Sequence, residues 1–195
     1  MGTNRLEAFS DGVIAIIVTI MVLELKLPPD GSPQALARMA PTALSYILSF
    51  VVVAIMWVNH HQLVHAARRV DSLLLWSNNF LLFAMSLIPF ATAYLGQHYT
   101  EPLPAALYGA VMTLCGLGFT WLRSTIGKSP SHDPVTLALA RQSKNWMSVV
   151  LYASSIPLAW SSVWLSFAIF VLIPVMYFMP QSGDDGRAAE SAPKL

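Results

Sequence analysis

Long apolar stretches alternate with short charged segments along this chain of 195 residues. Three intervals contain no Asp, Glu, Lys or Arg between their ends: Arg38 to Arg68, Asp71 to Glu101, and Glu101 to Arg123. Each interval can hold the ~20 residues with which an α-helix crosses the hydrocarbon core of a bilayer. The fourth such interval, from Lys144 to Asp184, has room for two crossings with a turn around Pro157 and the following Trp-Ser-Ser sequence.

Together with the apolar segment near the N-terminus, these intervals predict six transmembrane helices. We place them at residues 6–26, 40–64, 71–96, 103–123, 145–159 and 162–179. The runs are continuously apolar rather than alternating, which excludes a transmembrane β-barrel. The predicted fold class is therefore an all-α integral membrane protein, with residues 1–180 forming one transmembrane domain. Residues 181–195 are small, polar and charged, so we expect a disordered tail there.

The composition agrees with a membrane protein, because 55% of the residues are hydrophobic and only 11% are charged. Soluble domains have about 25% charged residues. A net charge of +1 gives no electrostatic reason to expect a nucleic-acid partner. Cys115 is the single cysteine, so no intrachain disulfide can form. Acids flank the first apolar run and no small-residue cleavage site follows it, so we expect that run to belong to the fold.

The distribution of Lys and Arg predicts the orientation in the membrane. Six crossings place both termini on one side, where nine basic residues gather: Arg5, Arg68, Arg69, Arg123, Lys128, Arg141, Lys144, Arg187 and Lys194. The other side has only Lys26 and Arg38. Because basic loops remain in the cytoplasm, both termini are expected to be cytoplasmic. The expected location is the cell membrane, with membrane lipid as the surroundings.

Polar residues gather at the predicted cytoplasmic ends of the first three helices. They are Arg5, Ser10 and Asp11; Trp57, Asn59, His60 and His61; and Asp71, Trp76, Asn78 and Asn79. Polar groups at membrane depth must find partners, so we expect a hydrogen-bonded network that ties the three helices together. Two interpretations remain open, namely a purely structural role and an additional role in sensing protons or ions.

Other chemistry finds less support. Adjacent histidines on a helix point about 100° apart, so His60 and His61 are a poor pair of ligands for one metal ion, and no cofactor is expected. The Gly116-Leu117-Gly118 sequence lies inside an apolar helix without the re-entrant loop of a carbonyl selectivity filter. Small residues at helix contacts account for it better. No nucleophilic Ser or Cys motif is present, so the chain is not expected to be an enzyme.

The first apolar run is short, because only twelve residues separate Asp11 from Glu24. Such a helix suits a position surrounded by protein better than one exposed to lipid on all sides. Within it, Ile16, Ile20 and Leu23 fall on one stripe that Thr19 borders. Periodicity alone favours the interpretation that these are ordinary core residues.

Three segments resemble the transmembrane protein 175 family of potassium channels. The segment "RLEAFSDGVIAI" from Arg5 matches the Arg-x-x-x-Phe-Ser-Asp signature that opens the family's first helix. The segments "WVNHHQLVH" from Trp57 and "LLLWSNNFLLFAMSLIPFATAYLG" from Leu73 look like its second and third helices. The similarity covers roughly Arg5 to Gly96, and the later helices match mainly in number and hydropathy.

This resemblance implies a homotetramer in which helix 1 of each copy lines a potassium-permeable pore. It implies a hydrophobic constriction of Ile16, Ile20 and Leu23 in place of a carbonyl filter, with Thr19 as the hydroxyl layer linked to selectivity. Permeating K⁺ and other monovalent cations would then pass near Ile16 and Thr19. It also implies a structural network of Arg5, Ser10 and Asp11 with one of His60 or His61 and one of Asn78 or Asn79. The alternative functions are a proton- or ion-coupled transporter that uses Asp11 and the His60-His61 pair, and a membrane enzyme or redox protein.

Overall fold

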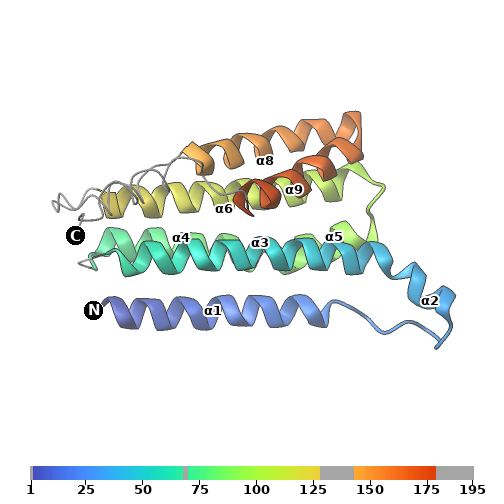
Figure 1. Cartoon of the computed structure of the whole chain (residues 1–195), viewed down its shortest axis with the longest axis horizontal. Coiled ribbons are helices and arrows are strands. Elements are labelled where there is room, and N and C mark those ends of the chain that lie inside the picture. Colours follow the sequence, from blue (N-terminus) through green and yellow to red (C-terminus); the bar gives the residue numbers. More distant parts are fainter. Residues whose placement is uncertain (1, 68–69, 128–142, 179–195) are drawn as a thin grey trace, which may run out of the picture.

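The computed structural model describes residues 2–67, 70–127 and 143–178. In these ranges the chain is helical, and we find no strand among the described residues. The helices are α1 (Thr3–Leu23), α2 (Pro33–Arg38), α3 (Ala40–His65), α4 (Ser72–Ser86), α5 (Ile88–Gln97), α6 (Pro102–Gly127), α8 (Ser143–Ser161) and α9 (Val163–Phe178). Figure 1 shows that the long helices run side by side, up and down the length of the molecule.

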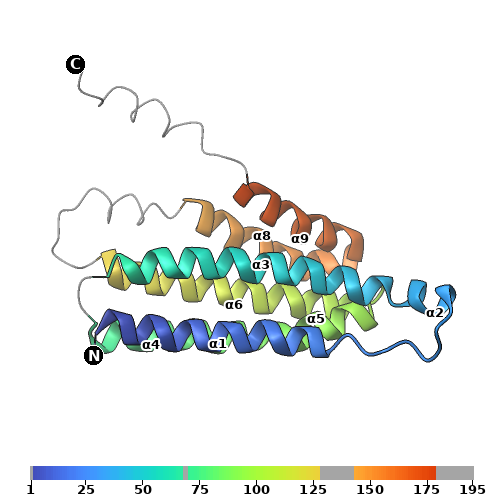
Figure 2. The same ribbon diagram turned by 60° about the horizontal axis from the view of Figure 1, so that its bottom comes forward.

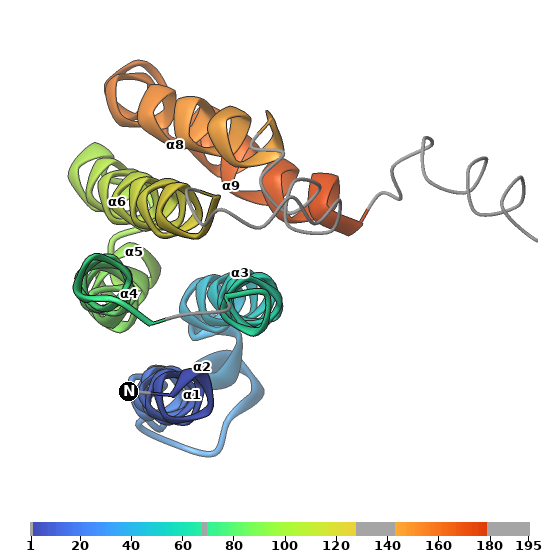
Figure 3. The ribbon, with the colours of Figure 1, turned by 90° about the vertical axis from the view of Figure 1, so that its left-hand side faces the viewer.

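The helix α1 lies at one edge of this bundle. Viewed end-on in Figure 3, α1 is furthest from α8 and α9, and α3, α4 and α6 lie between them. It packs against α3, α4 and α5, whereas α8 packs mainly on α6 and α9. After rotation in Figure 2, α1 again lies on the side away from α8 and α9, with α3 and α6 between them. One side of α1 is therefore covered by its own chain, and the other side is not.

Four helical segments are long and apolar enough to cross a membrane: Thr3–Leu23, Ala40–His65, Ser72–Gln97 and Pro102–Ile126. The third combines α4 and α5, which follow one another with only Leu87 between them. The apolar helix α9 has 16 residues and spans ~24 Å, which is less than the ~30 Å hydrocarbon core. The chain is thus an all-α protein with at least four membrane-capable segments, and crossings by α8 and α9 stay a prediction.

Several boundaries differ from those predicted from the sequence. The first helix was expected at 6–26 but ends at Leu23, because a tight turn follows in which the Lys26 N–H donates to the Glu24 carbonyl, 3.0 Å away. The turn between the last two helices lies at Ser162, within the predicted Trp-Ser-Ser sequence, and not at Pro157. The helix α8 continues through Pro157 and ends at Ser161.

The short helix α2 was not predicted. Its sequence carries the signal for a helix start, since Ser32 precedes Pro33 and a proline is favoured at the first helical position. The Ser32 Oγ accepts a hydrogen bond from the Ala35 N–H at 3.1 Å, which satisfies a backbone donor that the helix leaves free. The predicted tail, 181–195, lies outside the described residues.

Glycines in the buried helices mark close contacts rather than an ion filter. The helix α6 continues without interruption through Gly116 and Gly118. A methyl group on Gly116 would lie 2.6 Å from Cγ2 of Val149, and one on Gly118 would lie 3.1 Å from Cα of Leu81. These contacts place α6 against α8 and α4, so the Gly-Leu-Gly sequence serves helix packing, as the sequence indicated.

We expect Gly96→Ala to destabilise the fold. The added Cβ would lie 2.7 Å from Cα of Thr42, which is backbone of α3 and cannot rotate away. Such overpacking costs about 1–3 kcal/mol. Thermal unfolding in detergent measures the loss, with Gly12→Ala as the matched control because nothing lies within 4 Å of the methyl group it adds. Equal unfolding temperatures for the two variants would contradict the close approach of α5 to α3.

Candidate functional site

The helix α1 has a buried face and an exposed face. Its buried face consists of Leu6, Ser10, Ile14, Ile17 and Met21, spaced three or four residues apart as one helical stripe requires. This stripe contacts α3, α4 and α5. The residues that were predicted to form a constriction lie on the other face.

The exposed face of α1 is apolar. The exposed fractions are 58% for Ile16, 43% for Ile20 and 76% for Leu23, and Thr19 is exposed between them. The interpretation that these are core residues of the subunit is therefore wrong. The exposed face from Ile16 to Leu23 extends ~10.5 Å along the helix axis. Within the described part of one chain, no other helix faces it.

The hydroxyl group of Thr19 is turned back on its own helix. Its Oγ1 donates a hydrogen bond to the Ile16 carbonyl at 2.9 Å. Because this bond uses the only hydroxyl proton, the oxygen lone pairs remain available on the exposed face. The group can therefore accept a cation or a water molecule from that side.

A buried polar network joins α1, α3 and α4. The Nδ2 of Asn78 donates to the Ser10 Oγ at 3.1 Å, and that hydroxyl donates to the Leu6 carbonyl at 2.9 Å. On the other side of the amide, the Asn78 Oδ1 lies 2.7 Å from the His60 Nε2. An amide oxygen only accepts, so the proton lies on Nε2 of His60. Ser10, His60 and Asn78 are completely buried.

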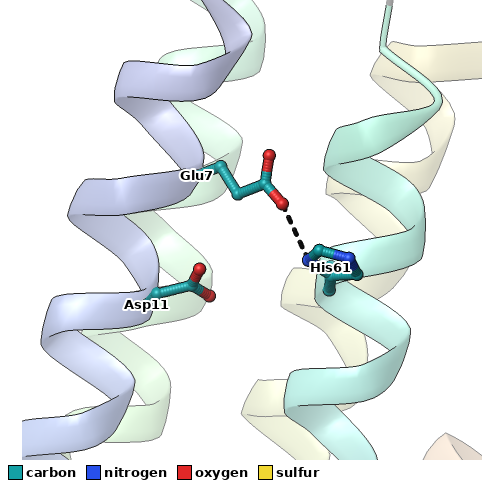
Figure 4. Close-up of side chains that lie close together, drawn as sticks. All are labelled: Glu7, Asp11 and His61. Atoms are coloured by element: carbon teal, nitrogen blue, oxygen red, sulfur yellow. Dashed lines mark ion pairs between the residues drawn. The ribbon is translucent and has the colours of Figure 1, made fainter.

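A second polar group lies at the α1–α3 contact. The indole N–H of Trp57 donates to the Asp11 Oδ1 at 2.9 Å. The Nδ1 of His61 lies 2.7 Å from the Glu7 Oε1. Figure 4 shows Glu7 and Asp11, one turn apart on α1, both reaching towards His61.

The two histidines thus have different neighbours. His60 points into the bundle towards Asn78, whereas His61 points towards α1 and is 48% exposed. Arg5 and Asn79 are exposed, and among the described residues neither side chain has a hydrogen bond to this network. Their roles stay a prediction.

Sequence reasoning did not select Glu7 as a site residue. The available signal was its spacing of four residues from Asp11, which places both carboxylates on one helix face. That His61 lies opposite these carboxylates could not be predicted without knowing how α1 and α3 are aligned along their length.

The fold and the site together define a helical membrane protein whose first helix is anchored by polar contacts at one end and presents an apolar face outward. The profile of the family described as "Endosomal/lysosomal potassium channel TMEM175" matches residues 5–89. A Chryseobacterium protein named as a potassium channel is 35% identical over 181 residues, which cover 92% of this chain and 94% of that protein. A Chamaesiphon minutus protein, also named as a potassium channel, is 30% identical, with 90% and 93% covered.

A solved structure is similar to the fold as well. The crystal structure of a TMEM175 homologue from Chamaesiphon minutus, named as a lysosomal potassium-selective channel homologue, superposes with a TM-score of 0.81 at 29% identity. The match covers 90% of this chain and 95% of that one. The chain therefore belongs to the TMEM175 family, as its signature residues indicated. That family consists of channels and not of enzymes, which confirms the expectation that the chain is not an enzyme.

Proposed function

We propose that this protein is a potassium-permeable cation channel whose pore is lined by α1 from several copies of the chain. The observation that carries the proposal is the exposed apolar face of α1, which lies outside the stripe that holds α1 to its own subunit. The relatives of similar length, which are named as potassium channels, support the choice of ion.

A pore requires more than one chain, since α1 lies at the edge of the bundle and one chain cannot enclose an axis. We propose four copies related by a fourfold axis, with α1 innermost. In this arrangement the exposed face of each α1 becomes one quarter of the pore wall. Mass measurement in detergent, or a fourfold-symmetric image, tests the tetramer.

In the proposed pore, Ile16 forms the narrowest ring, and Ile20 and Leu23 extend the apolar constriction. Apolar rings close a pore by excluding water, so a small rotation of α1 opens or closes the path. The backbone carbonyls of α1 from Thr3 to Thr19 are used within the helix, which leaves the Thr19 hydroxyls as the ligands near the Ile16 ring. These few ligands replace only part of an ion's hydration shell. Because K⁺ loses hydration water at a lower free-energy cost than Na⁺, we expect moderate selectivity for K⁺ over Na⁺.

Both termini are proposed to be cytoplasmic. The N-terminus, the end of α3, the start of α4 and the end of α6 lie at one end of the molecule (Figure 1). Arg5, in the first turn of α1, and Arg123, near the end of α6, are basic residues of that end. The positive-inside rule then gives the orientation of the whole bundle in the cell membrane.

The competing proposal, a coupled transporter, needs Asp11, His60 and His61 to pass protons between them. The contacts favour structural roles instead, because Asp11 accepts from Trp57, His60 bonds Asn78, and His61 pairs with Glu7. Recording of purified protein in liposomes under a K⁺ gradient separates the two. Unitary currents support the channel, whereas saturating flux coupled to a proton gradient without unitary currents would reject it.

Thr19→Ala is expected to lower the ratio of K⁺ to Na⁺ permeability while K⁺ current persists. The substitution removes the hydroxyl oxygen that partly replaces the ion's water and leaves the apolar rings in place. Reversal potentials under bi-ionic K⁺/Na⁺ conditions measure the ratio. The matched control is Thr113→Ala, because the Thr113 hydroxyl likewise bonds a carbonyl of its own helix, that of Gly109 in α6. An unchanged ratio in Thr19→Ala would remove Thr19 from the selectivity proposal.

A further inference from the structure

Three side chains of metal-binding type meet at the contact between α1 and α3. Glu7, Asp11 and His61 each offer one ligand atom, and these atoms all lie within 4.8 Å of one another. Figure 4 shows that the three side chains converge from two helices that are far apart in the sequence. The proposed pore face of α1 makes no use of them.

The charges at this contact are unbalanced. Two carboxylates one helical turn apart repel each other and destabilise an isolated helix by a few tenths of a kcal/mol. Among the described residues, the basic side chain that pairs with them is His61, 2.7 Å from Glu7, so at most one positive charge faces two carboxylates. Asp11 receives a hydrogen bond from Trp57, which is a neutral donor. A bound cation would balance both acids at once.

We propose that Glu7, Asp11 and His61 bind one divalent transition-metal ion, for which Zn²⁺ is the best fit. Zinc binds imidazole nitrogen and carboxylate oxygen at ~2.0–2.2 Å, which separates neighbouring ligand atoms by ~3.3–3.5 Å. The three ligand atoms lie within 4.8 Å of one another, with 2.7 Å between Glu7 Oε1 and His61 Nδ1, so binding requires them to shift into that range. The ligands are a Glu7 oxygen, an Asp11 oxygen and Nδ1 of His61, and water completes the tetrahedron.

The chemistry of the ligands selects among metals. An imidazole ligand suits Zn²⁺ and its transition-metal neighbours, whereas Mg²⁺ and Ca²⁺ prefer oxygen ligands alone. The indole of Trp57 holds the Asp11 Oδ1 in place, as groups hydrogen-bonded to metal-ligating carboxylates commonly do. The site is also accessible, because the side chain of His61 is 48% exposed and that of Glu7 is 19% exposed.

The metal would join α1 to α3 near the start of α1. On the proposed function, such a link restrains the helix that lines the pore, and Zn²⁺ at the cytoplasmic face lowers the open probability. This consequence rests on the proposed function, whereas the binding of metal does not. The two are therefore measured separately.

Calorimetric titration of the full-length protein in detergent with Zn²⁺ tests the site. We expect one Zn²⁺ bound per chain, with the affinity reduced at least about tenfold in both Glu7→Gln and His61→Gln. The control is His98→Gln, because His98 also lies beside a carboxylate, 3.0 Å from Glu101, but lacks a second acid. That variant is expected to bind Zn²⁺ as the unmodified protein does, and Mg²⁺ is not expected to compete.

Thermal unfolding distinguishes a variant that has lost the metal site from one that has lost its folded structure. Zn²⁺ is expected to raise the unfolding temperature of the unmodified protein and of His98→Gln, but not of the two ligand variants. Absence of saturable Zn²⁺ binding, or equal affinity in Glu7→Gln and His61→Gln, would overturn the proposal and leave an ion pair only. Zinc binding without K⁺ current in liposomes would uphold the metal site and reject the channel. K⁺ current without zinc binding would uphold the channel and reject the metal site.

Discussion

Ile16→Asn is expected to increase the K⁺ conductance of the reconstituted protein. In the proposed tetramer, four Asn side chains at the Ile16 ring would offer hydrogen bonds to water, so the constriction would stay hydrated where Ile excludes water. Each reduction of the barrier by ~1.4 kcal/mol raises the rate of passage about tenfold. Unitary conductance and open probability in liposomes measure the effect independently of the amount of protein.

The matched control for this substitution is Ile47→Asn. Ile47 is 54% exposed, close to the 58% of Ile16, but lies on α3, away from the proposed axis. A polar side chain at that position tests whether any exposed Ile→Asn change alters current. Increased conductance in Ile47→Asn, or none in Ile16→Asn at equal protein density, would reject α1 as the pore wall.

Asn78→Leu is expected to be the most destabilising single substitution in the polar network. It leaves the Ser10 hydroxyl and the His60 ring without their shared partner, and both groups are completely buried. An orphaned buried polar group costs about 1–3 kcal/mol. The Ser10 hydroxyl keeps its hydrogen bond to the Leu6 carbonyl, so the expected loss is that of the orphaned His60 ring, about 1–3 kcal/mol, seen as a lower unfolding temperature in detergent.

Asn79→Leu provides the control, because Asn79 is the adjacent residue on α4 and is exposed. This variant is expected to unfold at nearly the temperature of the unmodified protein. If the two variants lost stability equally, the network would not depend on Asn78. A larger loss in Asn79→Leu would place the anchoring amide on the other face of α4.

The helical segments were predictable because charge is absent over long intervals, and this pattern needs no knowledge of tertiary structure. The segment predicted at 40–64 appears as Ala40–His65, and the one at 71–96 appears as Ser72–Gln97. The errors in helix boundaries arose where local backbone geometry decides where a helix ends. At Leu23, for example, a turn that precedes two prolines ends α1. Apolar content alone could not reveal that turn.

The candidate site was predictable to the extent that helix periodicity defines faces. The spacing of Ile16, Ile20 and Leu23 identified one stripe, but whether that stripe faces the subunit or its surroundings required coordinates. The choice between His60 and His61 likewise required the rotation of α3 about its axis. The Glu7–His61 contact joins residues that are distant in sequence, so no local pattern could have indicated it.

The attachment of α1 to its subunit is uneven along its length. Among the described residues, the side-chain hydrogen bonds and ion pair that tie α1 to other helices come from Glu7, Ser10 and Asp11, and beyond them α1 is held by apolar packing. A helix held at one end can tilt about that end, and its displacement then grows with distance from it. From Ser10, Ile16 lies ~9 Å and Leu23 ~20 Å along the axis, so tilting α1 moves Leu23 about twice as far as Ile16. In the proposed pore of four α1 helices, such tilting widens the outer end, near Leu23, more than the region of Ile16.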